Sequence, residues 1–296
     1  MIRRLSIFTL VFLAVCSLSA QMISFDRKET VGSVKTALLK LKLSREYLFM
    51  IPGAGKPIRK LETMDLVLLT EIKVEKVNQK GQPVSLLLTP SVSGGTLNGR
   101  RVDSAPLKGR KIRAELEKFP CTFTTLDGKP LPDDAVVFLS ALFRQQQNIS
   151  YSDILGKVKK FQPGGKWLPN TAPILKSLAD RKLPLNKTNL KAQAMFENKF
   201  KVEGIECAAV VLNLSSVGTH AYDFQAKTRL ILPVKSEDGG IVRLAREGVE
   251  VVDRKSVSGD IAAAGSSLRI MTKEQLEVTY VLPKKSSSRK NPLKFF

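Results

Sequence analysis

Alternation of apolar and polar residues limits the folds open to this chain more than any other feature of its sequence. Residues 39–44 read Leu-Lys-Leu-Lys-Leu-Ser, and residues 276–282 alternate in the same way. Successive side chains of a strand point to opposite faces of a sheet, so a period of two predicts strands with one buried and one solvated face. Strands of this kind are typical of antiparallel sheets.

Turn residues divide the chain into two series of such strands. Asn98-Gly99 and Asp127-Gly128 mark reversals in the first series, and Glu203-Gly204 marks one in the second. The two series predict an N-terminal β-meander over residues 21–130 and a C-terminal β-meander over residues 189–283. The expected strands are 39–44 with 47–51 as its partner, 65–77, 84–92, 111–116, 122–125, 190–196, 205–214, 225–234, 241–246, 249–252 and 276–282.

Residues 131–188, between the two series, are predicted to form a helical insertion with a basic loop. Pro132-Asp133-Asp134 is typical of a helix start, and apolar residues recur at near-helical spacing up to about residue 146. A second helix is expected over residues 171–180, with Pro173 in its first turn.

These elements predict a mainly β (α+β) fold: two antiparallel β-meanders forming a curved sheet or half-barrel with a short two-helix insertion between them. With ten or more strands, the sheet must curl or close to cover its apolar face. We expect residues 21–283 to form one compact unit.

The N-terminus is typical of an export signal. Arg3 and Arg4 precede a short apolar run, and small residues follow it, so residues 1–20 are predicted to be removed after Ser19 or Ala20. The run is too short for a transmembrane helix. We therefore expect a periplasmic or extracellular protein without a transmembrane span. Cys16 offers lipidation as an alternative, although Val15 stands where a small residue is wanted.

Charge indicates the class of partner. The 296 residues contain 48 Lys and Arg against 27 Asp and Glu, which gives a formal net charge of +21. Such an excess favours anionic partners. For an exported protein these are lipid headgroups or an anionic envelope polymer rather than nucleic acid. Residues 284–296 carry five Lys or Arg and no acid, and are expected to be a disordered basic tail.

The residues needed for common catalytic sites are scarce. His220 is the only histidine, and no Gly-x-Ser-x-Gly motif is present. Gly53-Ala54-Gly55-Lys56 lacks the first glycine and the final Ser or Thr of a phosphate-binding loop. We therefore expect no enzyme activity, no catalytic or metal site and no cofactor. Asp127 is explained as a turn residue, and Asp133 and Asp134 as helix-start residues.

Two cysteines remain after removal of the signal. Cys121 and Cys207 could pair in an oxidising compartment, or each could be buried separately as a thiol. The sequence leaves both alternatives open.

The basic loop between the two predicted helices is the candidate binding site. It interleaves lysines with two aromatic residues, a mixture that can bind membrane surfaces or polyanions. Alternatively, the aromatic side chains cap the open end of the core while the lysines stay in solvent. The candidate residues are Lys157, Lys159, Lys160, Phe161, Lys166 and Trp167.

Residues 162–167, Gln-Pro-Gly-Gly-Lys-Trp, together with the 39–47 stretch and the Asp127-Gly128-Lys129 turn, resemble a group of exported β-rich bacterial proteins with a Pro-Gly-x-x-Trp element. That group has no assigned activity, so the resemblance implies only location and architecture. In overall layout the chain is also distantly similar to periplasmic lipoprotein carriers, whose half-open barrel holds acyl chains under helices.

Two functional hypotheses follow. The first is a non-catalytic envelope protein that binds an apolar or anionic envelope component in its half-barrel. The alternative is an interaction module without an internal cavity, which docks on anionic membrane or polymer through its basic surface. An apolar pocket beneath the helices would favour the first, and a filled core with a basic outer face would favour the second.

Overall fold

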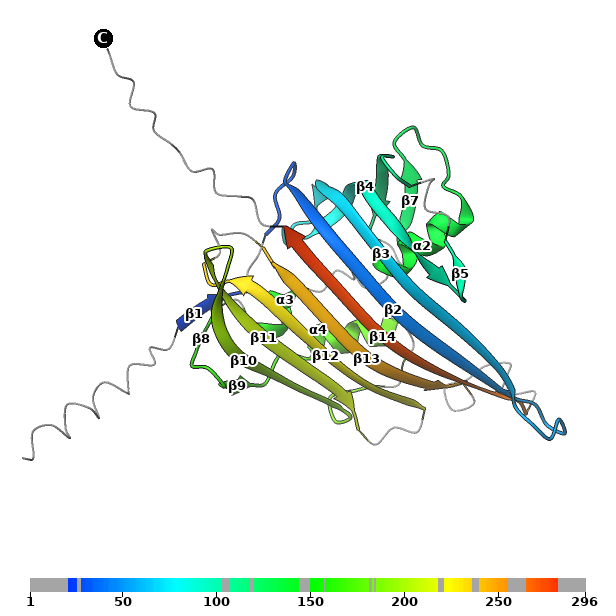
Figure 1. The fold of residues 1–296 in the computed structure, drawn as a ribbon. Helices are drawn as coiled ribbons and strands as arrows, with labels where there is room; N and C mark the ends of the chain where they lie inside the picture. Colours follow the sequence, from blue (N-terminus) through cyan, green and yellow to red (C-terminus); the bar gives the residue numbers. More distant parts are fainter. Residues whose placement is uncertain are drawn as a thin grey trace, which may run out of the picture.

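Alternating strands assemble into one open antiparallel sheet in the computed structural model (Figure 1). The structure describes residues 21–25, 28–102, 107–117, 120–143, 150–156, 158–180, 183, 185–217, 221–235, 240–254 and 265–281. Within these residues the sheet has 12 strands, in the order β7-β6-β4-β3-β2-β14-β13-β12-β11-β10-β9, with β5 paired to β4. The predicted mainly β fold with a curved open sheet is confirmed.

The strands of the first half are β2 (Val34–Met50), β3 (Ile58–Val77), β4 (Pro83–Leu97), β5 (Arg100–Arg101), β6 (Ile112–Glu115) and β7 (Thr122–Thr125). Those of the second half are β9 (Lys166–Trp167), β10 (Leu190–Val202), β11 (Ile205–Ser216), β12 (Tyr222–Pro233), β13 (Arg243–Asp253) and β14 (Ser267–Val281). A separate two-stranded sheet pairs β1 (Gln21–Ser24) with β8 (Val158–Phe161).

Helices cover one face of the large sheet. Helix α2 (Asp133–Phe143) buries Phe138, Leu139 and Phe143 on the first half of the sheet. Helices α3 (Tyr151–Leu155) and α4 (Ala172–Asp180) pack on β10, β11 and β12, and lie behind these strands in Figure 1. Each fully buried Leu or Phe side chain contributes about 1.5–3 kcal/mol, so this face holds the hydrophobic cores.

The last strand of the large sheet, β14, pairs with the first strand of that sheet, β2. Strand β14 pairs along its whole length with β2, from Ser267 opposite Met50 to Val281 opposite Thr36. The two predicted meanders are therefore continuous halves of a single sheet, and the two strands furthest apart in the sequence lie at its centre. Leu244 contacts the hydrophobic clusters of both halves and so connects them.

The predicted break after residue 44 is wrong. Residues 39–44 and 47–51 are not partner strands, because β2 runs unbroken through Arg45 and Glu46. These charges are accepted within the strand because the neighbouring strand β3 supplies partners: Arg45 lies 3.9 Å from Glu62, and Glu46 pairs with Arg59. Similarly, the separate strands expected at 241–246 and 249–252 are one strand, β13, which continues through Gly248.

Both predicted helices are present within the described residues. The structure adds α3, which precedes the basic loop and was not predicted. Ser150 caps this helix by accepting a hydrogen bond from the backbone N–H of Ser152 at 3.2 Å. Five residues give too little periodicity to be recognised from sequence.

Cys121 and Cys207 are not joined by a disulfide. Cys121 is half-buried against the first-half cluster, and its Sγ lies 3.8 Å from the carbonyl oxygen of Phe143. Cys207 is fully buried in a small cluster with Ile205, Ile231 and Val242. The structure therefore has the second of the two alternatives, two separately placed thiols.

Several predictions lie outside the described residues: the signal peptide over 1–20, His220, and the basic tail over 284–296. Within the described residues, no helix combines the length and the hydropathy needed to cross a membrane.

Candidate functional site: a polar trough on the open face of the sheet

Of the residues of the predicted binding loop, the structure describes the side chains of Lys160, Lys166 and Trp167. Trp167 lies on β9 and is half-buried in the second-half core, with its ring centroid 6.3 Å from that of Phe25. Lys160 and Lys166 are exposed, but they belong to different sheets, opposite Met22 and Met195 respectively. Lys157 and the side chains of Lys159 and Phe161 lie outside the described part of the chain.

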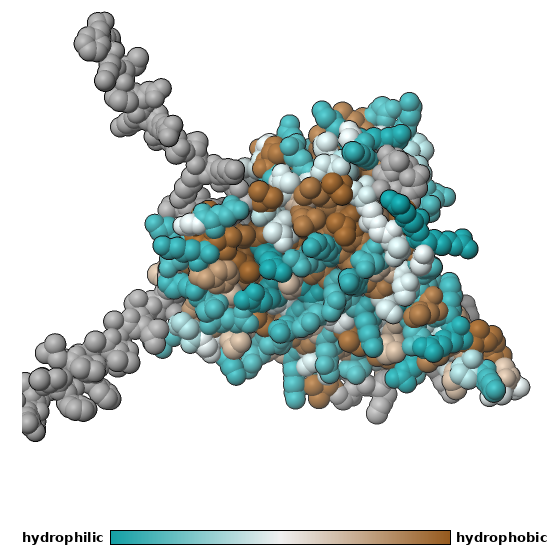
Figure 2. Space-filling model, viewed as in Figure 1, coloured by the Kyte–Doolittle hydropathy of each residue, from teal (hydrophilic) through white to brown (hydrophobic). Residues whose placement is uncertain are grey.

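A large hollow lies instead on the face of the sheet opposite the helices. This trough has a volume of about 1290 Å³ and is lined by β2, β3 and β10 to β14, with Leu168 at its edge. Figure 2 shows this side of the molecule as a mainly hydrophilic surface, with apolar side chains gathered in its upper part. There Leu38, Leu69 and Val92 form one row across β2, β3 and β4.

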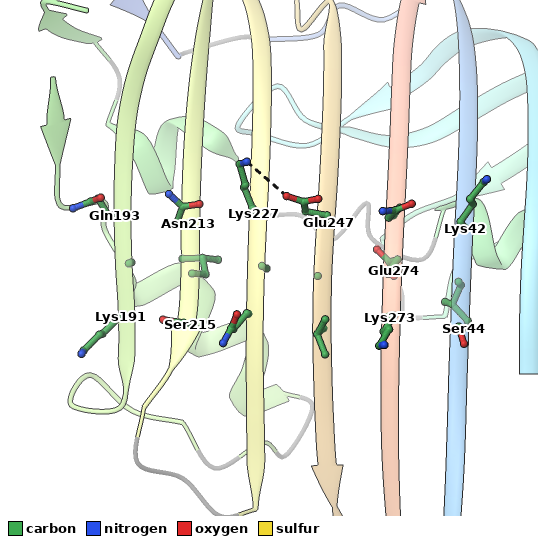
Figure 3. Close-up of a pocket in the computed structure, with 18 of the residues that line it drawn as sticks. Lys42, Ser44, Lys191, Gln193, Asn213, Ser215, Lys227, Glu247, Lys273 and Glu274 are labelled. Atoms are coloured by element: carbon green, nitrogen blue, oxygen red, sulfur yellow. Dashed lines mark ion pairs between the residues drawn. The ribbon is translucent and has the colours of Figure 1, made fainter. Parts of the chain in front are cut away.

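The floor of the trough is built from rows of side chains that cross the strands. Antiparallel pairing sets residues of neighbouring strands opposite one another, so polar residues at matched positions form a continuous line. The first row, drawn in Figure 3 from β10 to β2, is Gln193, Asn213, Lys227, Glu247, Gln275 and Lys42, and it continues to Asp65 on β3.

A second row runs parallel to the first. It consists of Lys191, Ser215, Gln225, Val249, Lys273 and Ser44. Neighbouring strands are separated by about 4.8 Å, so Lys191 and Lys273, four strands apart, anchor the row about 19 Å from each other. By the same spacing, the first row extends about 29 Å from β10 to β3.

Some charges of the trough are paired and some are not. Lys227 lies 3.7 Å from Glu247, and Lys42 lies 3.7 Å from Asp65. Within the described residues, neither Lys191 nor Lys273 has a carboxylate within ion-pair distance. The trough therefore presents two uncompensated ammonium groups, with hydroxyl and amide side chains between them.

A second hollow of about 340 Å³ extends the trough along the strands. It shares Lys42, Lys227, Glu247 and Gln275 with the trough. It adds Lys40 and Arg229, of which Arg229 donates to Glu197 at 2.6 Å. It also adds Glu277, which lies opposite Lys40, so the mixed basic and acidic lining continues beyond the first row.

The chemistry that the trough offers is recognition by charge and hydrogen bonds. Amide, hydroxyl, ammonium and carboxylate groups line it, and none of its lining side chains is aromatic. Among the described residues, no group of three or more His, Cys, Asp or Glu side chains could hold a metal ion.

Sequence analysis missed this site because each of its residues occupies an ordinary outward position. A Lys or Gln on the wet face of a strand is the expected alternation. The available signal was that six or more strands carry Lys, Gln, Asn or Ser at outward positions, but which of these positions are adjacent depends on the register.

Comparison with known proteins identifies no family. No protein-family model and no curated protein matches the sequence. The resemblance to exported Pro-Gly-x-x-Trp proteins therefore stays a prediction.

The matches among solved structures include lipovitellin, in a structure described as showing lipid–protein interactions. The identity is 10% and the TM-score 0.31; the match covers 86% of this chain and 25% of lipovitellin, so this chain spans about a quarter of its length. A second is the type II secretion system secretin XcpQ of Pseudomonas aeruginosa, at 9% identity and a TM-score of 0.12, covering 93% of this chain and 62% of XcpQ.

Proposed function

We propose that this protein is an exported, non-catalytic binding protein that holds an anionic, hydroxyl-rich envelope polymer along the polar trough of its open sheet. The observation that carries the proposal is the second row of the trough, in which Lys191 and Lys273 flank Ser215, Gln225 and Val249, and Ser44 follows Lys273. The ammonium groups attract carboxylate or phosphate, and the side chains between them donate to and accept from hydroxyls.

The shape of the trough favours an elongated ligand. Its rows cross up to seven strands and are open to solvent along their length, whereas a compact metabolite would need an enclosed pocket. A polymer can contact several strands at once, and the sum of many weak contacts then replaces burial as the source of affinity.

Packing on the opposite face of the sheet favours an anionic ligand over an apolar one. Phe138, Leu139, Ile174 and Leu178 on α2 and α4 are buried directly against the strands. A carrier of acyl chains needs an apolar space at that place.

The test uses polygalacturonate, whose units carry carboxylates and hydroxyls, with dextran as a neutral polymer of similar length. We expect the protein to bind polygalacturonate in calorimetric titration and not to bind dextran. The affinity should fall as salt is added, because screening weakens the contacts of exposed charges. The double variant Lys191→Gln/Lys273→Gln should lose about fivefold in affinity or more.

The matched control is Lys108→Gln/Lys176→Gln, which removes the same charge from exposed sites on other parts of the surface. It should bind like the parent. Equal loss in both double variants would mean that net charge alone attracts the polymer, and the trough would be rejected as the site. Equal binding of dextran would reject the anionic specificity.

A further inference from the structure

The hairpin that joins β2 to β3 extends past the neighbouring strands (Figure 1). Strand β4 pairs with β3 only as far as Leu97 opposite Met64, and β14 pairs with β2 only as far as Ser267 opposite Met50. Residues 51–57 therefore lie beyond the last pair on either side. We call residues 49–61 the β2–β3 tip.

Apolar side chains on the β2–β3 tip are exposed to an unusual degree. Five of them have exposed fractions between 36% and 56%: Phe49, Met50, Ile51, Ile58 and Leu61. Contiguous exposed apolar residues on a soluble domain mark an interaction site. Their number on one short projection sets the tip apart from the isolated exposed residues elsewhere, such as Val137 on α2.

These side chains point to both faces of the hairpin. Phe49 lies opposite Ile58, and both share a face with Tyr47, whose ring stacks on Phe49 at 6.4 Å between centroids. Leu61 lies opposite Glu46, one position out of phase with them, and so belongs to the other face. The tip therefore carries apolar side chains on both of its faces, whereas a strand that fits a protein groove would carry them on the side that enters the groove.

The apex itself is small and uncharged. Residues 52–55 read Pro-Gly-Ala-Gly, and Gly53 and Gly55 have φ angles of 81° and 66° with open space around them. Positive φ at both glycines gives a tight, narrow turn that other residues would form at a cost. Within the turn, the four residues between Ile51 and Lys56 therefore carry only small, uncharged side chains.

Cations surround the apolar residues. Lys56 stands beside the apex, and Arg59 and Lys60 follow Ile58. Lys60 donates to Glu62 at 2.9 Å, and this hydrogen bond raises the pKa of Lys60 above its ordinary value, which already lies well above neutral pH. Counting Arg45 and the two acids Glu46 and Glu62, the projection has a net positive charge.

We infer that the β2–β3 tip docks this protein on an anionic lipid bilayer by inserting its apolar end among the headgroups. With Ile58 among the headgroups, Arg59 and Lys60 lie about 3 and 7 Å further out along the strand, within the roughly 5–10 Å to which interfacial segments are buried. At that depth Arg59 and Lys60 lie at the level of the headgroup phosphates, and Tyr47 lies at the interface where aromatic side chains are enriched.

The first experiment measures sedimentation of the protein with vesicles of phosphatidylglycerol and phosphatidylcholine, and with vesicles of phosphatidylcholine alone. We expect binding to the mixed vesicles only. Ile51→Ser/Ile58→Ser should bind them about tenfold more weakly, because two apolar side chains no longer enter the bilayer. The matched control Val92→Ser/Val137→Ser removes two exposed apolar side chains elsewhere and should bind normally.

A charge pair tests the second part of the inference. Lys56→Glu and Lys108→Glu change the net charge equally, but only Lys56 lies on the tip. We expect only Lys56→Glu to weaken vesicle binding. Equal loss in both variants, or equal binding to vesicles of phosphatidylcholine alone, would overturn the proposed role of the tip cations.

A spectroscopic readout keeps the inference testable should a serine variant fail to fold. Tryptophan at position 51 (Ile51→Trp) should shift its emission to shorter wavelength on mixed vesicles and be quenched by lipid brominated near the headgroup. Tryptophan at position 92 (Val92→Trp), in the apolar row of the open face, should do neither. Absence of both effects at position 51 would overturn insertion of the tip.

The inference is separable from the proposed polymer binding. Ile51→Ser/Ile58→Ser should still bind polygalacturonate, and Lys191→Gln/Lys273→Gln should still bind mixed vesicles. If the parent protein binds polygalacturonate but not mixed vesicles, the inference about the tip is refuted and the polymer proposal stands. If it binds mixed vesicles but not polygalacturonate, the polymer proposal is refuted and the inference about the tip stands.

Discussion

Leu41 on β2 lies directly opposite Leu276 on β14, although 235 positions separate them in the sequence. Both side chains are buried on the helix-covered face of the sheet, at 2% and 8% exposure. The flanking positions on the same strands, Lys42 and Gln275, are likewise opposite each other but line the trough. One pair of strands therefore contributes to the hydrophobic core on one face and to the candidate site on the other.

Truncation on the buried face should be costly. Leu41→Ala removes a fully packed side chain, and we expect the free energy of unfolding to fall by about 2–5 kcal/mol. Lys42→Ala, one position along on the trough face, should change it by no more than about 0.5 kcal/mol. Urea unfolding followed by circular dichroism measures both. Similar losses at the two positions would contradict the assignment of the faces.

Two adjacent glycines should respond differently to the same substitution. Gly95 has a φ of 142°, and a Cβ added there would lie 2.0 Å from the carbonyl oxygen of Asp65 on β3, whereas a Cβ on Gly94 would meet nothing within 4 Å. Gly95→Ala should therefore cost about 2 kcal/mol or more. Gly94→Ala should be close to neutral or slightly stabilising. The midpoints of thermal unfolding of the two variants measure this difference. Equal midpoints would contradict the close approach of β4 to β3.

Alkaline pH should unfold the protein in part through Tyr280. Burial raises the pKa of its phenol to about 12, from 10 for an unperturbed tyrosine. The folded state therefore binds this proton more tightly than the unfolded state, so the contribution is intact below pH 10 and is lost as the pH rises to about 12. Tyr280→Phe should make the free energy of unfolding fall less steeply across this range.

Tyr151 is a second phenol whose pKa burial raises to about 12. Tyr151→Phe should therefore flatten the same part of the pH profile, and the double variant should flatten it further. A parental profile as flat as that of the double variant would contradict the burial of both phenols.

The cysteines should behave as separate thiols. We expect an alkylating reagent, added without reductant, to modify both Cys121 and Cys207 once the protein is unfolded in denaturant. In the folded protein, Cys207 should be unmodified because it is fully buried. Cys121 should react slowly, because burial raises the pKa of its thiol and lowers the thiolate fraction. Mass spectrometry of the peptides measures this, and a Cys121–Cys207 peptide would contradict it.

Local patterns predicted most of the elements. Strict alternation located β14, turn residues bounded the segments that form β4, β6, β7 and β11, and carboxylates followed by spaced apolar residues located α2. Prediction failed where an interaction between strands stabilises a local exception. Arg45 and Glu46 resemble a break between strands until Glu62 and Arg59 on β3 are placed opposite them.

The candidate site was harder to predict from the sequence than the strands and helices. Sequence reasoning chose the Lys157–Trp167 loop because lysines and aromatic residues are adjacent there. In the structure Trp167 packs against Phe25, a residue 142 positions earlier in the chain, and so contributes to the core. Nothing in the local sequence distinguishes an aromatic side chain that caps a hydrophobic core from one that binds a ligand.

The sequence by itself determined which side chains of each strand share a face, because the period of a strand is a local property of the backbone. It also determined that the sheet is antiparallel and that one of its faces is wet. Only the tertiary structure decided that β14 pairs with β2, and that Lys191 and Lys273 belong to one row that ends at Ser44. The register between distant strands depends on burying the apolar side of each half of the sheet under α2, α3 and α4 at the same time. That condition involves residues from the whole chain.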